Sequence, residues 1–351
     1  ERVGYASGQR KRAAKMTKRE RIRAVLAGEI PDRVPVAFWH HFGPGYEYGP
    51  AAVDAHLEHF ERYDLDFLKV MNDNAYPREK EFLVRTGDDL RKLRVLGGDE
   101  EPFLRQLELV AALRRKLGPE VLIASTVFSP YSVLRQLAGP ERRVHNPPKL
   151  ELGDDERDQV LGLLLRTSGE LVHEALLCIA ATLSRFTRYC LEAGADGIFF
   201  SVRDDWVESA LPKPGTYDSI VREADLVVCR SASAGSFNVL HICGRAVDFS
   251  VFSAYPVQVI NWADRACGPA IREATRVLKP AICAGVDNFT TLVHGTPQDC
   301  RAEVLDALGQ TGGRPMIIAP GCTYAPEAVP AENLGAICSA AREFHFAEEK
   351  Q

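Results

Sequence analysis

Short, nearly all-apolar runs alternate along this chain with segments of helical periodicity, and this alternation restricts the fold more than any other feature. The apolar runs lie at residues 34–41, 65–71, 121–128, 198–202, 238–243, 257–262, 281–286 and 315–322. Strands that are apolar on both faces are typical of a parallel sheet that is covered on both sides. Eight such strands, separated by helices within 351 residues, predict an α/β fold built as one (β/α)8 TIM barrel.

The segments between the strands predict the helices of this barrel. They lie at about residues 51–64, 104–117, 156–193, 268–278 and 297–309. We expect the longest of them to break near Ser168-Gly169. A helix before the first strand begins at Thr17, has Glu20 at capping-box spacing and ends at Gly28. A doubly wound open sheet is the alternative, but no glycine-rich phosphate-binding fingerprint follows the first strand.

The domain boundaries follow from the same pattern. Residues 16–351 are interpreted as a single barrel domain. Residues 1–15 are polar and basic, without the apolar segment of a secretion signal, and are predicted to form a flexible leader. Two stretches, 142–148 and 203–236, are predicted to be insertions into the barrel, the second of them rich in loops.

Charge and cysteine content exclude several classes of function. The formal net charge of −5 gives no basic field that would attract nucleic acid or an anionic membrane. No apolar run reaches the roughly 18 residues that a membrane span needs. The nine cysteines are scattered and odd in number, which favours reduced thiols over a disulfide framework. We therefore predict a cytoplasmic monomer or homodimer without nucleic-acid or membrane partners.

The carboxyl ends of the predicted strands carry the candidate site, because active sites of TIM barrels lie there. His241 and Cys243 are two residues apart on one strand, so their side chains point to the same face. Cys322 lies at the tip of the last strand, and a glycine adjoins both cysteines. Two thiolates and one imidazole neutralise Zn²⁺ and leave one tetrahedral position open, as in catalytic zinc sites. The other seven cysteines are interpreted as small apolar core residues.

Polar side chains near the other strand ends are candidate contacts for a substrate or for the metal ligands. They are His40, His41, Asn72, Asp204, Tyr255, Asn261, Asp287 and Tyr324. Each has a structural alternative: the two histidines could serve in packing, and Asp204 could form a solvated loop pair with Asp205.

Several motifs resemble the uroporphyrinogen decarboxylase superfamily over nearly the whole chain. They are MTKRERIRAVLAGEIPDRVPV (16–36), AGADGIFFS (193–201), LHICG (240–244) and the Gly-Cys pair of the last strand. Within that superfamily the chain is more similar to corrinoid-linked methyltransferases, such as the methylcobamide:coenzyme M type. The resemblance implies an H-x-C…C zinc site on His241, Cys243 and Cys322. It also implies a thiol acceptor activated by zinc, and a methylated corrinoid donor carried on a separate protein.

The decarboxylases of the superfamily are a poorer match. Their arginine-rich segment after the first strand, which binds propionate carboxylates, corresponds here to residues 38–46, where there is no arginine. The decarboxylases also have a histidine near the end of the eighth strand, where this chain has Cys322. Both departures argue against decarboxylation of a tetrapyrrole.

Two further alternatives remain open at the level of sequence. One is a zinc enzyme of the same fold with different chemistry, in a specialised biosynthetic or demethylation pathway. The other is a binding protein that kept the fold and lost turnover, although the intact set of metal ligands argues against it.

Overall fold

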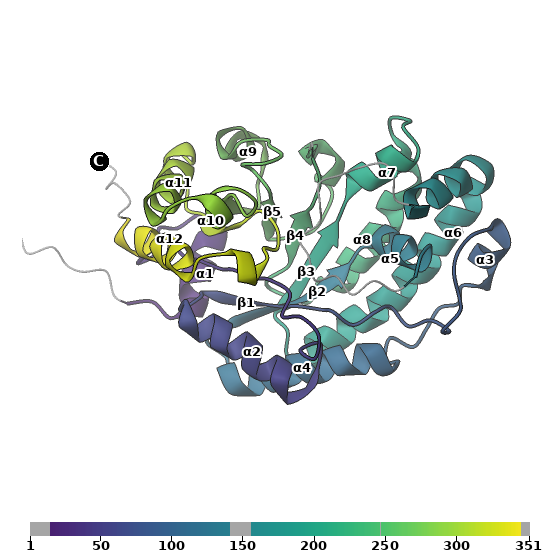
Figure 1. Ribbon diagram of the computed structural model, residues 1–351, viewed down its shortest axis with the longest axis horizontal. Coiled ribbons are helices and arrows are strands. Elements are labelled where there is room, and N and C mark those ends of the chain that lie inside the picture. The colour runs from purple at the N-terminus through teal and green to yellow at the C-terminus, as the bar shows by residue number, and fades with distance from the viewer. Residues whose placement is uncertain (1–14, 141–155, 246, 345–351) are drawn as a thin grey trace, which may run out of the picture.

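The computed structural model describes residues 15–140, 156–245 and 247–344 (Figure 1). The predicted leader, apart from Lys15, and the predicted insertion at 142–148 lie outside these residues. Seven parallel strands form one sheet in the order β1 to β7. They are β1 (Phe67–Val70), β2 (Leu122–Phe128), β3 (Gly197–Val202), β4 (Val239–Ile242), β5 (Val259–Trp262), β6 (Ala281–Val286) and β7 (Ile317–Pro320).

Helices surround the curled sheet (Figure 1). They are α1 (Lys18–Ala27), α2 (Gly49–Arg62), α3 (Gly87–Lys92), α4 (Glu101–Leu117), α5 (Pro130–Leu137), α6 (Glu156–Glu192), α7 (Asp204–Ala210), α8 (Arg222–Ser231), α9 (Ile271–Val277), α10 (Thr291–His294), α11 (Pro297–Gln310) and α12 (Ala331–Glu343). In the view of Figure 1, α2 and α4 lie below the sheet, and α9 to α12 lie at the upper left. The predicted (β/α)8 barrel is thereby confirmed.

The expectation of eight regular strands is wrong at one position: residues 34–41, the first predicted strand, do not form a regular strand. This segment makes only isolated parallel bridges, Val36 with Ile318 and His40 with Tyr324. It still occupies the eighth position of the barrel, because Ile318 N–H donates to the Pro35 carbonyl on one side (2.9 Å) and Asp66 N–H to the Val36 carbonyl on the other (2.9 Å).

Two features of the chain prevent a regular ladder in this segment. Pro35 has no N–H to donate. The N–H of Val36 donates to the side-chain carboxylate of Asp66 at 2.8 Å instead of to a backbone carbonyl. Asp66 is fully buried and also forms ion pairs with Arg21 and Arg33, each at 2.7 Å. This network closes the barrel between the 34–41 segment and β1.

The predicted first helix and the predicted break in the long helix are both confirmed. Thr17 and Glu20 form the reciprocal capping box of α1, and Gly28 ends the helix with φ of 76°. In α6, Ser168 has the non-helical angles φ −149° and ψ 37°.

The expectation that residues 203–236 are mostly loop is wrong. This region contains α7, a π-helix at Tyr217–Val221 and α8. The turn residues Pro212, Pro214 and Gly215 separate two short amphipathic helices, and their concentration obscured the helical periodicity.

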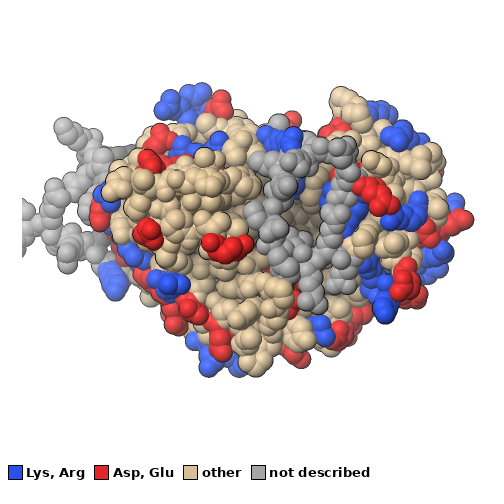
Figure 2. Space-filling view, viewed as in Figure 1, with Lys and Arg blue, Asp and Glu red and all other residues tan. Residues whose placement is uncertain are grey.

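The apolar side chains form an inner and an outer core. The inner core fills the barrel and includes Trp39, Phe67, Phe199 and Val239. The larger outer core packs the strands against the helices. Across residues 15–140, 156–245 and 247–344, no helix combines the length and apolarity that crossing a membrane requires. On the face shown in Figure 2, acidic and basic side chains intermingle around the edge, and the visible described residues form no large patch of one sign.

Candidate metal centre

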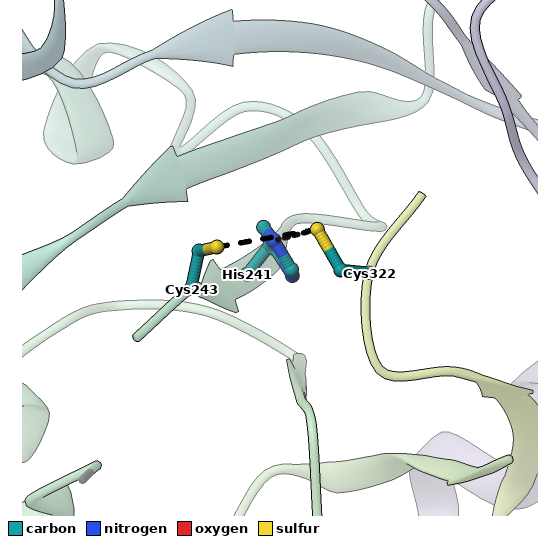
Figure 3. A group of neighbouring side chains, drawn as sticks. All are labelled: His241, Cys243 and Cys322. Atoms are coloured by element: carbon teal, nitrogen blue, oxygen red, sulfur yellow. Dashed lines mark hydrogen bonds between the residues drawn. The ribbon is translucent and has the colours of Figure 1, made fainter. Parts of the chain in front are cut away.

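Three side chains from two strand ends meet at the carboxyl end of the barrel. His241 is in β4, Cys243 follows that strand directly, and Cys322 lies two residues beyond β7. The N–H of Cys243 donates to the Val202 carbonyl of β3 (2.9 Å), which continues the sheet to the cysteine. His241 and Cys243 therefore share one face of an extended segment, as their spacing predicted. Figure 3 shows the three side chains pointing toward one another.

The distances between the ligand atoms match the geometry of a tetrahedral zinc site. The sulfur atoms of Cys243 and Cys322 lie 4.0 Å apart, and Nε2 of His241 lies 3.6 Å from the Cys322 sulfur. The three atoms all lie within 4.8 Å of one another. Ideal zinc bond lengths and tetrahedral angles place two sulfurs about 3.8 Å apart, and sulfur and nitrogen about 3.6 Å apart. The residues therefore fit zinc with small adjustments, and three ligands leave a fourth position open.

Asn261 of β5 fixes which nitrogen of His241 faces the two sulfurs. Its Nδ2 donates to the carbonyls of Cys283 (2.7 Å) and Pro320 (3.0 Å), so the amide oxygen must point the other way. That oxygen lies 2.6 Å from Nδ1 of His241 and accepts its proton. Nε2 is then unprotonated in the neutral ring and presents a lone pair toward the sulfurs, as a metal ligand must.

The site is largely buried, and its two thiols form a hydrogen bond. His241 and Cys322 are buried, and Cys243 is partly buried. The hydrogen bond between the thiols lowers the pKa of Cys322 well below its usual value and raises the pKa of Cys243. The imidazole of His241 stacks on the ring of Phe199, with a centroid distance of 5.4 Å. The imidazole of His241 is therefore held both by its hydrogen bond to Asn261 and by its packing on Phe199.

Charged residues at the start of α7 adjoin the turn after Cys243. Arg203 forms a two-point ion pair with Asp205, at 2.9 and 2.7 Å. A Cβ atom at Gly244 would lie 3.4 Å from the Asp204 carboxylate, so the predicted residue Asp204 lies against this turn. Burial, and then the negative charge of Asp205, raise the pKa of Asp204 to about 7. A side chain at Gly244 would therefore contact the carboxylates of both Asp204 and Asp205.

His40 and Tyr324 lie beside the barrel wall and not in its interior. Both pack in a cluster of rings with Phe42 and His59, at centroid distances of 4.4 to 5.3 Å from His40. Tyr324 belongs to the outer core. His40 and Tyr324 line a cavity of about 370 Å³ between α2 and the start of α12. These two predicted substrate contacts are therefore separated from the three ligands by the strands.

His41 and Asn72, predicted as substrate contacts, have partners within the chain. Nδ1 of His41 lies 2.5 Å from the Asp73 carboxylate. Asn72 donates to the Thr126 carbonyl at 3.3 Å and accepts the N–H of Asn74 at 3.2 Å. In this structure both side chains hold the loop that follows β1.

Tyr255 and Asp287 also make structural contacts. The Tyr255 hydroxyl donates to the buried carboxylate of Asp225 at 2.9 Å and lies 3.2 Å from the Tyr217 hydroxyl. Asp287 accepts the backbone N–H groups of Phe289 (2.8 Å) and Thr290 (3.0 Å), which is a turn motif. Of the predicted substrate contacts, Asn261 is the one that bonds to a member of the candidate metal centre, His241.

Sequence reasoning overlooked Lys69, which lies in the middle of β1 and is buried. Its position was itself a signal, because a charged side chain interrupts an otherwise apolar strand, Phe67-Leu68-Lys69-Val70. Burial of lysine is uncommon unless a partner or a function retains it.

The chain is similar to known proteins in sequence and in fold. The family described as uroporphyrinogen decarboxylase (URO-D) matches residues 68–344. A solved methyltransferase from Methanosarcina mazei is similar in fold, with a TM-score of 0.70 and 20% identity, over 94% of this chain and 99% of its own. A B12-independent methionine synthase from Shewanella sp. W3-18-1 matches 67% of this chain and 66% of its own, with a TM-score of 0.45 and 11% identity. No protein with a curated description matches significantly.

Proposed function

The chain belongs to the uroporphyrinogen decarboxylase family, and from this premise we propose that it is a zinc-dependent methyltransferase that methylates a thiol. The observation that carries the proposal is the tetrahedral spacing of His241, Cys243 and Cys322, with one position left open. A soft set of two sulfurs and one nitrogen selects zinc over the harder divalent ions. Bound there, zinc would lower the pKa of a coordinated acceptor thiol, so that the sulfur is deprotonated and nucleophilic at neutral pH.

The residues of the chain prepare this site before any acceptor arrives. Asn261 holds His241 in the tautomer that offers Nε2. Burial in the barrel mouth excludes water, which strengthens electrostatic interactions within the site. Two anionic sulfur ligands keep the centre electron-rich, which preserves the nucleophilicity of a third sulfur.

The methyl donor that we propose is a methylated corrinoid on a separate protein, docked over the carboxyl ends of the strands. In the transfer, a carbon–sulfur bond forms as the carbon–cobalt bond breaks. The corrinoid keeps the electron pair and leaves as its cobalt(I) form, and the thiol proton passes to solvent. The resemblance of the sequence to corrinoid-linked methyltransferases supports this donor, and the fold it shares with the Methanosarcina mazei methyltransferase is compatible with it.

Decarboxylation of a substrate with several carboxylates is disfavoured by the charges on the chain. Residues 38–46 contain no arginine or lysine, and His40 and Phe42 in this segment pack among rings. Arg203, near the metal centre, is already paired with Asp205. Few cations are thus left on these segments to bind multiple carboxylates.

The test is a methyl-transfer assay with methylcobalamin and a panel of small thiols. Zinc-loaded protein should convert methylcobalamin to its cobalt(I) form in step with thioether formation. Protein treated with a chelator should lose this activity and regain it with added zinc. Equal rates with and without zinc would overturn the mechanism, and no reaction with any thiol would overturn the acceptor class.

A further inference from the structure

Lys69 extends its side chain inside the barrel toward the carboxyl end of the strands. Its Nζ lies 2.9 Å from the sulfur of Met71, two residues nearer that end. The ammonium also lies over the rings of Phe199, at 4.5 Å from the centroid, and Trp39, at 5.7 Å. Lys69 as a whole is only 6% exposed. A cation is thus held by two aromatic faces and a thioether inside the inner core.

This cation has no carboxylate partner within the described part of the chain. None of the described aspartates and glutamates forms an ion pair with Nζ, and the carboxylate of Asp73, in the loop after β1, is bonded to His41 at 2.5 Å. Burial lowers the pKa of Lys69 to about 8, and the negative charges of Cys322 and then Asp73 act in the opposite direction. A buried positive charge without an anionic partner lowers the stability of the fold. Its presence in the barrel therefore indicates a functional role for the charge.

The ring of Phe199 connects Lys69 to the metal centre. The ammonium lies over this ring, and the imidazole of His241 stacks on the same ring at 5.4 Å. Two thiolates neutralise a divalent ion, so a neutral fourth ligand leaves the centre uncharged. An anionic fourth ligand leaves one negative charge inside the barrel, which a nearby ammonium balances.

We propose that Lys69 is the counter-charge that makes the open position of the metal centre selective for an anionic ligand. The inference rests on the metal centre of the proposed function and deepens it, because it explains how the acceptor sulfur is held in its anionic form. The hydrogen bond and ring contacts of Lys69 are made with Met71, Phe199 and Trp39, and not with His241, Cys243 or Cys322. Lys69 is a positioning residue that acts through the field of one buried charge.

The test replaces Lys69 with an uncharged side chain in cobalt-loaded protein, where ligand binding changes the visible spectrum. Lys69→Met suits the apolar surroundings of the ammonium, and Lys69→Gln provides a second neutral variant. The probes are azide, which is an anion, and imidazole, which is neutral. The control is Lys92→Met, which removes an exposed positive charge at the end of α3.

We expect both Lys69 variants to bind azide about tenfold more weakly than the wild type, because removing one buried positive charge weakens the attraction for an anion in a partly shielded site. Imidazole binding should stay unchanged, and Lys92→Met should behave as the wild type. Equal azide affinity in all proteins would overturn the proposal, as would equal weakening of azide and imidazole. Absence of azide binding in the wild type, or loss of cobalt from both Lys69 variants, would also overturn it.

The azide measurement separates this inference from the proposed function. A protein that binds azide through Lys69 but methylates no thiol would support the counter-charge and refute the thiol acceptor. A protein that methylates thiols, with azide affinity independent of Lys69, would refute the counter-charge alone.

Discussion

Oδ1 of Asn261 lies 2.6 Å from Nδ1 of His241, and the opposite end of the same amide is bonded to two backbone carbonyls. The two residues are register partners on β4 and β5. The barrel therefore fixes the imidazole tautomer through a side chain whose own orientation has no freedom. A second contact of this kind typically changes the metal affinity of a ligating histidine by about 10- to 100-fold.

Replacing Asn261 with alanine should weaken zinc binding by about 10- to 100-fold, because the imidazole loses the acceptor that fixes its tautomer. Competition with a chromogenic chelator measures the affinity. The matched control is Asn333→Ala, since Asn333 is also buried and its Nδ2 also donates to two backbone carbonyls, at 3.0 and 2.9 Å. Unchanged affinity in Asn261→Ala, or equal loss in both variants, would refute the role of this contact.

Replacing Asp66 with alanine should lower the free energy of unfolding by up to about 3–5 kcal/mol, because Arg21 would keep only Asp32 and Arg33 only its longer pair with Asp64. Urea unfolding measures the change. Asp88→Ala is the control: it removes an exposed ion pair with Arg91 on α3, and such pairs contribute at most about 1 kcal/mol. A loss at Asp66 no larger than the loss at Asp88 would contradict the closure of the barrel by this carboxylate.

Acid should lower the stability of the fold through His56 and His59, the two buried histidines of α2. Burial lowers the pKa of His56 to about 4 and that of His59 to about 3, from an unperturbed value of 6.5. Groups with a lowered pKa contribute their full stability above pH 6.5 and lose it as the pH falls toward 4 and then 3. His59→Leu should therefore reduce the loss of unfolding free energy between pH 7 and pH 4, measured by urea titration. The exposed His294→Gln should leave this slope unchanged, and an unchanged slope in His59→Leu would contradict the account.

Asp225 should produce the opposite pH dependence. Burial raises its pKa to about 7 from 3.8, even though Tyr217 and Tyr255 donate hydrogen bonds to it. A group with a raised pKa contributes its stability fully below the unfolded value and loses it as the pH rises toward 7. Asp225→Asn should therefore be more stable relative to the wild type at pH 8 than at pH 5, by at least about 1 kcal/mol. The same difference at both values would show that the carboxyl is already ionised in the folded protein at pH 5, so that its pKa is not raised.

The sequence was sufficient to predict the barrel and the meeting of His241, Cys243 and Cys322 at its rim. The alternation of apolar runs with helices identifies the fold, and the i, i+2 spacing of His241 and Cys243 places both on one face of a strand. Cys322 could be added because the carboxyl ends of all strands in a parallel barrel meet at one rim.

The sequence did not show which of the other candidate side chains point into the barrel and which point outward. Strands that are covered on both sides are apolar on both faces, so polarity does not distinguish the two directions. Trp39 and Phe67 point into the barrel, which turns the neighbouring His40 outward. No difference in polarity between the two faces of residues 34–41 would have shown this. Asn261 was grouped with the substrate contacts because its pairing with His241 depends on the register between β4 and β5, and register is a property of the folded sheet.

Zinc content is the most direct test of the central claim that His241, Cys243 and Cys322 form one metal centre. The comparison is between the wild type, Cys322→Ala and Cys283→Ala, where Cys283 is also buried and belongs to the inner core but not to the group of three candidate ligands. Elemental analysis, with circular dichroism as a check of folding, should find about one zinc per chain in the wild type and in Cys283→Ala, and little in folded Cys322→Ala. No zinc in the wild type, or full zinc content in Cys322→Ala, would contradict the metal centre and the function proposed from it.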